Sequence, residues 1–106
     1  MTTVGLAGLG YWGPNLARNF DQLADLTWVC DFDEELRASF TARYPRARVT
    51  AGFEEMLTDP GLDAVVIATA HSGVDYARLV ADSSLVVDLR NATGRAGISS
   101  EKVWKL

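Results

Sequence analysis

The chain has 106 residues, of which 48% are hydrophobic and 23% are charged, with a formal net charge of −4 at pH 7. These values are typical of a single globular domain, and they argue against nucleic acid or an anionic membrane as a partner, since there is no basic run and no apolar run near the ~20 residues of a membrane span. The one cysteine, Cys30, excludes an internal disulfide and a cysteine-rich metal site, so we expect a cytoplasmic protein without a bound metal.

The first predicted strand spans residues 3–7 and leads directly into residues 8–13, whose sequence is GLGYWG. Gly8 is expected to let the chain leave the strand in a tight turn. Gly10 would let the backbone approach a pyrophosphate, and Gly13 would let the next helix pack close to the sheet. The first-turn N–H groups of that helix and the positive end of its dipole would hold the phosphates, with Tyr11 and Trp12 also at the cofactor. The alternative is a glycine-rich turn that binds nothing.

A helix is predicted from residue 12 to about residue 23, with Pro14 in its first turn, where a missing N–H costs little. Its apolar face has helical spacing. That face comprises Trp12, Leu16, Phe20 and Leu23.

The second predicted strand, residues 26–31, ends at Asp31, eighteen positions after Gly13. A carboxylate at this distance from a glycine-rich turn is expected to accept hydrogen bonds from the adenine ribose and to repel the 2′-phosphate of NADP, which favours NAD. The alternative is an ordinary acid at the end of a strand. Asp33 is predicted to cap the next helix, and Pro45 to end it.

The rest of the chain continues to alternate between strand and helix. A weak strand at 48–50, a short helix at 53–58 and a turn at 59–61 are followed by residues 64–68, which are apolar throughout, as in a central parallel strand. We then expect a helix from a cap at Ser72 through Asp82, a strand at 85–89, a loop at 94–100, and either an edge strand or an unpaired tail at 103–106.

This alternation predicts an α/β fold: a single compact Rossmann-like domain with a doubly wound parallel sheet of five or six strands. With the strand order 3-2-1-4-5, the switch point lies between the first and fourth strands, where ligands bind beyond the carboxyl ends. Thr69 and His71 follow the fourth strand and would border that crevice, so both are candidate cofactor-binding residues.

Several other residues are compatible with two roles. His71, the only histidine, suits proton transfer, but a loop histidine bonded to backbone is the favoured interpretation. Arg90 could hold a phosphate, although a local polar network with Asp88 and Asn91 is favoured. The remaining expectations are an inert buried thiol at Cys30, core positions for Trp12 and Trp28, and an edge or partner contact for Trp104. No catalytic residue is assigned.

Residues 3–69 resemble the NAD-binding domain of the Gfo/Idh/MocA oxidoreductases. The matching segments are residues 4–15 (VGLAGLGYWGPN), 29–31 (VCD) and 63–69 (DAVVIAT). The form GYWGPN is similar to members that act on nucleotide-linked sugars. This resemblance implies NAD(P)-dependent oxidation or reduction at a sugar hydroxyl or carbonyl.

The resemblance ends after Thr69. The family's Glu-Lys-Pro motif, whose lysine contributes to catalysis, corresponds here to residues 87–91 (VDLRN), and no lysine precedes Lys102. These 106 residues are also expected to lack the family's substrate domain. Residues 70–106 instead resemble the C-terminal end of UDP-glucose/GDP-mannose dehydrogenases, through residues 70–72 (AHS), 75–76 (DY), 85–92 (LVVDLRNA) and 102–106 (KVWKL). That implies a UDP-binding segment, with a family junction near residues 67–70.

The sequence therefore predicts the NAD-binding domain of a sugar or nucleotide-sugar dehydrogenase, incomplete for catalysis on its own. Its partners would be the dinucleotide and, if the resemblance holds, a nucleotide-sugar, with a homodimer or a partner catalytic chain left open. The alternative is a non-enzymatic Rossmann-like module that binds a UDP-sugar or dimerises.

Overall fold

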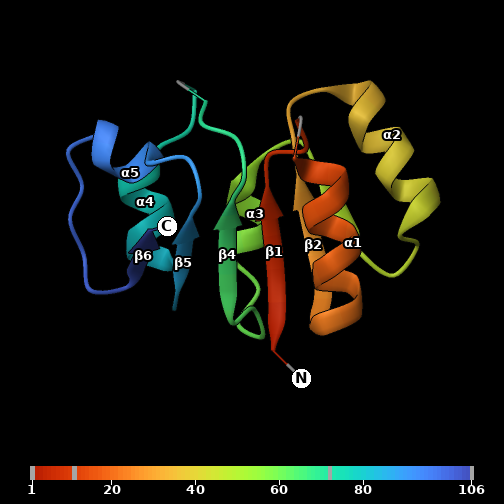
Figure 1. The fold of residues 1–106 in the computed structure, drawn as a ribbon, viewed down its shortest axis with the longest axis horizontal. Helices are drawn as coiled ribbons and strands as arrows, with labels where there is room; N and C mark the ends of the chain where they lie inside the picture. Colours follow the sequence, from red (N-terminus) through yellow and green to blue (C-terminus); the bar gives the residue numbers. More distant parts are fainter. Residues whose placement is uncertain (1, 11, 72, 106) are drawn as a thin grey trace.

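The computed structural model describes residues 2–10, 12–71 and 73–105. Within these ranges it contains one sheet of six parallel strands, in the spatial order β3-β2-β1-β4-β5-β6 (Figure 1). The strands are β1 (Thr3–Ala7), β2 (Asp25–Cys30), β3 (Arg48–Thr50), β4 (Ala64–Ile67), β5 (Val86–Asp88) and β6 (Val103–Lys105). The predicted strand order and doubly wound α/β fold are confirmed, and the reversal of order lies between β1 and β4.

Helices cover both faces of the sheet, so the domain has three layers (Figure 1). Helices α1 and α2 pack against one face, and α3, α4 and α5 pack against the other. Their bounds are α1 (Gly13–Leu23), α2 (Glu34–Arg43), α3 (Phe53–Leu57), α4 (Tyr76–Asp82) and α5 (Ala92–Arg95). No helix in the described ranges has both the length and the apolar character needed to cross a membrane.

The central strand β4 shows how the sequence builds these layers. Every residue of β4 is buried, and successive side chains point to opposite faces. Val65 and Ile67 join the core beneath α3 and α4, whereas Val66 and the following Ala68 join the core beneath α1 and α2. A strand covered on both faces has no polar side, which is why residues 64–68 are apolar without alternation.

Most predicted elements hold to within a few residues, and Asp33 does cap α2, accepting the N–H groups of Glu35 (2.8 Å) and Leu36 (3.2 Å). The apolar face of α1 was predicted too broadly. Trp12 is the N-cap and is 52% exposed, and Leu23 in the last turn is 79% exposed, so neither lies in the core. The buried residues of the helix are Gly13 and Ala17, so the sheet covers only one side of its first half and middle.

The C-terminal third differs most from expectation. Helix α4 starts at Tyr76 with Asp75 as its cap, later than a cap at Ser72 predicts; Ser72 lies outside the described residues. Ala77, expected to face inward with Tyr76, is exposed. Residues 94–100, expected as a loop, begin with the end of α5.

The last strand, β6, settles one open alternative. Residues 103–105 pair with β5 in parallel register and form an edge of the sheet, so this segment is an edge strand and not an unpaired tail. Trp104 on that strand is 66% exposed, whereas Trp28 is buried as predicted. A partner surface at Trp104 stays a prediction.

Candidate cofactor site

The turn after β1 requires glycine at position 8. Gly8 has φ +97°, a conformation that side-chain-bearing residues rarely adopt, and a Cβ built there would lie 2.6 Å from Cβ of Thr69. The Gly8 N–H donates to the carbonyl of Cys30 (2.8 Å), which ties the turn to the end of β2. The turn therefore passes closely between the ends of β2 and β4.

The other two motif glycines are less constrained by the protein itself. A Cβ at Gly10 would lie 3.1 Å from Oγ1 of Thr69, a tight contact, and at Gly13 it would lie 3.5 Å from Cβ of Leu9, an ordinary one. Gly13 is buried at the start of α1, as predicted, but a methyl group fits there. Its expected role in close helix packing thus permits alanine as well.

The first turn of α1 presents backbone donors. The N–H groups of Gly10, in the turn before α1, and of Asn15 have no acceptor among the described residues, which do not include Tyr11, four positions before Asn15. Gly13 N–H donates to the carbonyl of Gly10 (3.1 Å), and Pro14 has no N–H. Backbone N–H groups at a helix N-terminus can form an anion-binding site. Tyr11, expected at the cofactor, lies outside the described residues.

Asp31 directly follows β2 and connects two loops. Its Oδ2 accepts the N–H of Leu9 in the glycine-rich turn (2.7 Å), and its Oδ1 accepts the N–H of Asp33 (2.8 Å). Each carboxylate oxygen thus has one protein donor and can accept a second. Arg37, the nearest base, donates through Nη1 to the carbonyls of Asp31 (3.0 Å) and Phe32 (2.9 Å), which holds its guanidinium against the backbone.

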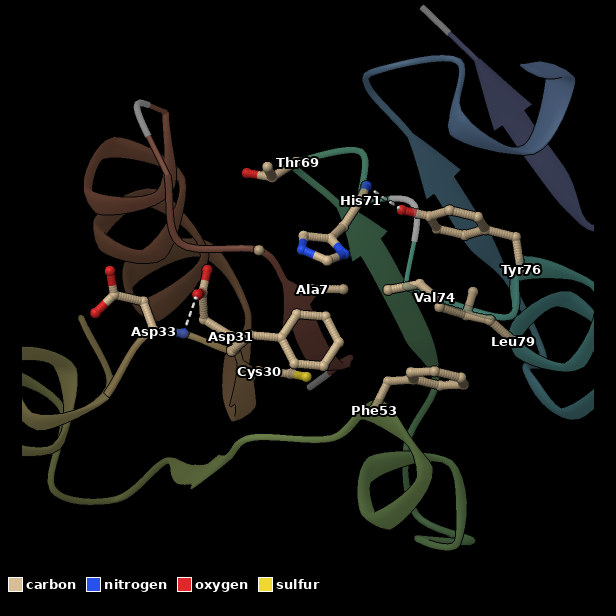
Figure 2. Close-up of a pocket in the computed structure, with 12 residues that line it drawn as sticks. Ala7, Cys30, Asp31, Asp33, Phe53, Thr69, His71, Val74, Tyr76 and Leu79 are labelled. Atoms are coloured by element: carbon tan, nitrogen blue, oxygen red, sulfur yellow. Dashed lines mark hydrogen bonds between the residues drawn. The ribbon is translucent and has the colours of Figure 1, made fainter. Parts of the chain in front are cut away.

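A cavity of about 410 Å³ opens beside Asp31 at the switch point; we call it the Asp31 cavity. Figure 2 shows His71 between the Asp31 side and the Tyr76 side, with Cys30 and Phe53 below. Gly8 and Thr69 also line it, so the structure brings together five of the predicted cofactor-binding residues. Those residues are Gly8, Gly10, Asp31, Thr69 and His71.

Two rings meet at this cavity. The centroids of Phe32 and His71 are 4.6 Å apart with an interplanar angle of 48°. The His71 loop is held by its own hydrogen bonds: its N–H donates to the Tyr76 hydroxyl, and its Nδ1 accepts the N–H of Gly73, both at 2.9 Å (Figure 2 draws the first). The prediction of a loop histidine bonded to backbone is confirmed, although the same ring also lines the cavity.

Burial sets the ionisation of two groups in the Asp31 cavity. Burial, with the nearby charges of Asp31 and Glu54, raises the pKa of Cys30 to about 12, so its thiol stays protonated at neutral pH. The predicted burial of Cys30 is confirmed, and its inertness stays a prediction. Burial also raises the pKa of Tyr76, against the opposing effect of its hydrogen bond from His71, so its phenol is neutral.

A second cavity of about 490 Å³ lies at the carboxyl ends of β4 and β5, beside the start of α1; we call it the β5 cavity. Asp88 borders it, yet its carboxylate accepts the N–H groups of Arg90, Ala92 and Thr93 and the Thr93 hydroxyl, at 2.6 to 3.1 Å. The favoured polar network is therefore partly right. Among the described residues, Asp88 bonds to the backbone N–H of Arg90 and not to its guanidinium, and it makes no hydrogen bond with the Asn91 side chain.

The sequence missed part of the Asp31 cavity wall. Phe32, Phe53, Val74 and Tyr76 line it, and none was singled out as a site residue. Phe32 carried a usable signal, because it directly follows the strand-end acid and so lies in the same loop at the carboxyl edge of the sheet. In the described part of the chain, no three histidine, cysteine or carboxylate groups are placed to hold a metal ion.

The family model described as "Oxidoreductase family, NAD-binding Rossmann fold" (Gfo/Idh/MocA) matches residues 2–87. The chain belongs to this family. The match continues past residues 67–70, and no comparison supports the expected resemblance of residues 70–106 to UDP-glucose/GDP-mannose dehydrogenases. No curated protein sequence matches the chain significantly.

Several solved structures have the same fold as this Gfo/Idh/MocA domain. GenD2 from gentamicin A biosynthesis, crystallised with NAD, is 29% identical over 91% of this chain, with a TM-score of 0.75. The WlbA dehydrogenase from Bordetella pertussis, with NADH and UDP-GlcNAcA, is 21% identical over 98% (TM-score 0.74). The myo-inositol dehydrogenase from Lactobacillus casei, with NAD(H) and myo-inositol, is 18% identical over 99% (TM-score 0.76).

The last two likenesses establish the fold alone. The chain covers 29% of the length of GenD2 and 36% of each of the other two. The chain therefore spans about a third of the length of each of these three proteins.

Proposed function

We propose that this chain is the cofactor domain of an NAD-dependent oxidoreductase that acts on a hydroxyl or carbonyl of a sugar or nucleotide-linked sugar. The observation that carries the proposal is the position of Asp31. Its carboxylate bonds to the glycine-rich turn through Leu9 and borders the Asp31 cavity, and each oxygen retains acceptor capacity. Two ribose hydroxyls can donate to those two oxygens.

The diphosphate of the dinucleotide would lie over the start of α1. The N–H groups of Gly10 and Asn15 are its donors there, and the positive end of the helix dipole adds to the attraction. This placement puts the adenosine half on the Asp31 side of the turn. Gly10 serves this arrangement because a side chain would fill the space next to Thr69 that the diphosphate approaches.

The adenine base would enter the Asp31 cavity. Its volume lies within the usual range for small-molecule sites, and its walls are largely apolar, with contributions from Phe53, Val74 and Leu79. The Phe32 and His71 rings offer aromatic faces on which a purine stacks. Thr69 would border the path from this cavity to the diphosphate.

Selectivity for NAD over NADP would follow from charge at the ribose. A 2′-phosphate would be placed against the Asp31 carboxylate, where like charges repel. The nearest cation, Arg37, is held on the backbone carbonyls of residues 31 and 32. The field here is negative, and the site lacks the free arginine that a 2′-phosphate requires.

Turnover needs a second wall that holds the sugar against the nicotinamide. We propose that residues beyond these 106, or a partner chain, supply that wall and the catalytic groups. A sugar or polyol substrate is supported by the family match and by the sugar-modifying dehydrogenases that share this fold.

Calorimetric titration with NAD and NADP tests the proposal. We expect the wild-type chain to bind NAD more tightly than NADP. Asp31→Ala should weaken NAD binding by about tenfold to a hundredfold, because it removes charge-assisted hydrogen bonds worth ~1.5–3 kcal/mol each. In the same variant, the affinities for NAD and NADP should become more similar, because the repulsion of the 2′-phosphate is lost.

Asp25→Asn is the matched control. It removes an exposed carboxylate at the opposite end of β2, so the net charge changes equally while the site is untouched. Equal NAD and NADP affinities in the wild-type chain would overturn the selectivity. No NAD binding by a folded wild-type chain would overturn the function itself.

A further inference from the structure

The β5 cavity holds two cationic side chains, Arg90 at the end of β5 and Lys105 at the end of β6. Because β5 and β6 are neighbouring parallel strands, both side chains lie at the carboxyl ends of the strands. Trp12, Leu16, Ala68 and Leu89 supply apolar wall to the same cavity.

Among the described residues, neither cation has an ion-pair partner within 4 Å. Neither the Arg90 guanidinium nor the Lys105 ammonium makes a hydrogen bond or ion pair with the part of the chain that the structure describes, where the one ion pair joins Arg78 and Asp82. Asp88 lines the cavity too, but it is 1% exposed. Its oxygens accept the N–H groups of Arg90, Ala92 and Thr93 and the Thr93 hydroxyl. Arg90 and Lys105 are exposed and outnumber the one carboxylate in this cavity, that of Asp88, so the cavity is locally positive in a chain with net charge −4.

The β5 cavity and the Asp31 cavity occupy different parts of the carboxyl edge of the sheet. The Asp31 cavity is lined from the ends of β1 and β2, whereas the β5 cavity is lined from the end of β5 and, through Trp12 and Leu16, from the start of α1, next to the proposed diphosphate donors. With the adenosine half in the Asp31 cavity, the reactive half and the substrate reach toward the β5 cavity.

We propose that Arg90 and Lys105 bind an anionic group, carboxylate or phosphate, of the sugar substrate in the β5 cavity. The inference rests on the proposed function, since it takes the cofactor's position as given. Arginine presents a planar fork that matches both anions in two parallel hydrogen bonds, and lysine adds a compact charge. The substrate class is therefore an acidic sugar and not a neutral one.

An NMR titration of the ¹⁵N-labelled 106-residue chain tests this, because amide shifts report weak binding residue by residue. D-glucuronate and D-glucose 6-phosphate are the anionic probes, and D-glucose is the neutral probe with the same ring. Each is titrated with and without saturating NAD. We expect both anions to shift the amides of residues 88–91 and 105, and D-glucose to leave them unmoved.

Arg90→Gln and Lys105→Gln should each weaken D-glucuronate binding about tenfold, the loss of one charge-assisted contact. Arg95→Gln is the control, because it removes an exposed cation that lies outside the β5 cavity. The NAD affinity of all three variants should match the wild type.

Equal shifts with D-glucose and D-glucuronate would overturn the proposal. So would a tenfold loss of NAD affinity in Arg90→Gln and Lys105→Gln, because the cations would then serve the cofactor's diphosphate. Failure of the proposed function has a different signature: NAD would leave the amides of Leu9, Gly10 and Asp31 unshifted, whatever the sugar probes do.

Discussion

Asp31 and Asp88 stand at the carboxyl ends of two strands in the same parallel sheet, and both accept backbone N–H groups from the loops that follow. Asp88 is 1% exposed and accepts four hydrogen bonds, all from residues 90–93. Asp31 accepts two, one of them from the distant Leu9, although both carboxylates border a cavity. We therefore expect remaining acceptor capacity, and not residue type or position in the fold, to distinguish a binding carboxylate from a structural one.

The two surroundings also differ in how they are built. The Asp31 side is assembled from separated segments, since residues 7–8, 30–33, 53 and 69–79 meet at one cavity. The Asp88 side is local, because one strand end caps the short helix α5 that follows it. We therefore expect substitutions near Asp31 to act mainly on ligand binding, and those at Asp88 to act mainly on folding.

The largest expected effect is that of Asp88→Ala on stability. The change leaves the N–H groups of Ala92 and Thr93 buried without acceptors, at ~1–3 kcal/mol each, so the free energy of unfolding should fall by about 3 kcal/mol or more. Urea unfolding followed by circular dichroism measures this. Asp31→Ala is the matched comparison and should lose only about 1 kcal/mol, because water reaches the vacated site. Equal losses of unfolding free energy in Asp88→Ala and Asp31→Ala would contradict the proposed difference between the two aspartates.

A second large effect is expected at the turn that Asp31 supports. Gly8→Ala forces a side chain into a left-handed conformation and against Thr69, so we expect a loss of about 2–3 kcal/mol in unfolding free energy. Gly13→Ala is the control, since its methyl group meets only ordinary contacts. It should stay within about 0.5 kcal/mol of the wild type and keep its NAD affinity. A destabilised Gly13→Ala would mean that close helix packing, and not the turn, is what the motif protects.

The sequence predicted the parts of the fold that have strong local rules. The apolar run at residues 64–68 placed the central strand, and the glycine spacing with Asp31 placed the switch point. Other features depend on contacts that no local pattern encodes. Helix α5 reaches into the expected loop at 94–100, and it forms because Asp88, upstream of its N-cap Asn91, accepts the N–H groups that begin the helix.

The same limit applies to the candidate site. Gly8, Asp31, Thr69 and His71 were found because each lies at a strand end or in a motif. Phe53 was missed because it starts a helix elsewhere in the chain and reaches the cavity only through the tertiary fold. Helical periodicity placed Trp12 in the core because it does not show that the helix begins only at Gly13, which leaves Trp12 as an exposed N-cap.

Phe32→Ala should have a moderate effect, and on binding alone. Half of the Phe32 surface is exposed, so its removal costs little stability, but it deletes a ring on which adenine would stack. At ~1–3 kcal/mol per stacked base, NAD affinity should fall about tenfold. Calorimetry with nicotinamide mononucleotide, which lacks the adenosine half, supplies the control and should give the same affinity in both proteins. Loss of affinity for both ligands would point to a damaged loop instead of a lost stack.

The smallest expected effect is the contribution of Asp88 to stability at acid pH. Burial acts to raise the pKa of Asp88, but the Thr93 hydroxyl and the three N–H groups outweigh it, so its pKa is lowered. Because the folded chain favours the ionised form, this stabilisation is complete above the unfolded pKa of about 3.9 and is lost as the pH falls through the folded pKa. The loss is smaller than in Asp88→Ala because a protonated carboxyl keeps both oxygens.

Urea midpoints measured from pH 6 down to about pH 2 should therefore fall less steeply in Asp88→Asn than in the wild type. The variant should retain some slope, because a hydrogen bond from the Trp28 indole also lowers the pKa of Asp59. Asp25→Asn should follow the wild-type curve, and an Asp88→Asn curve parallel to the wild type would show that Asp88 does not titrate with unfolding.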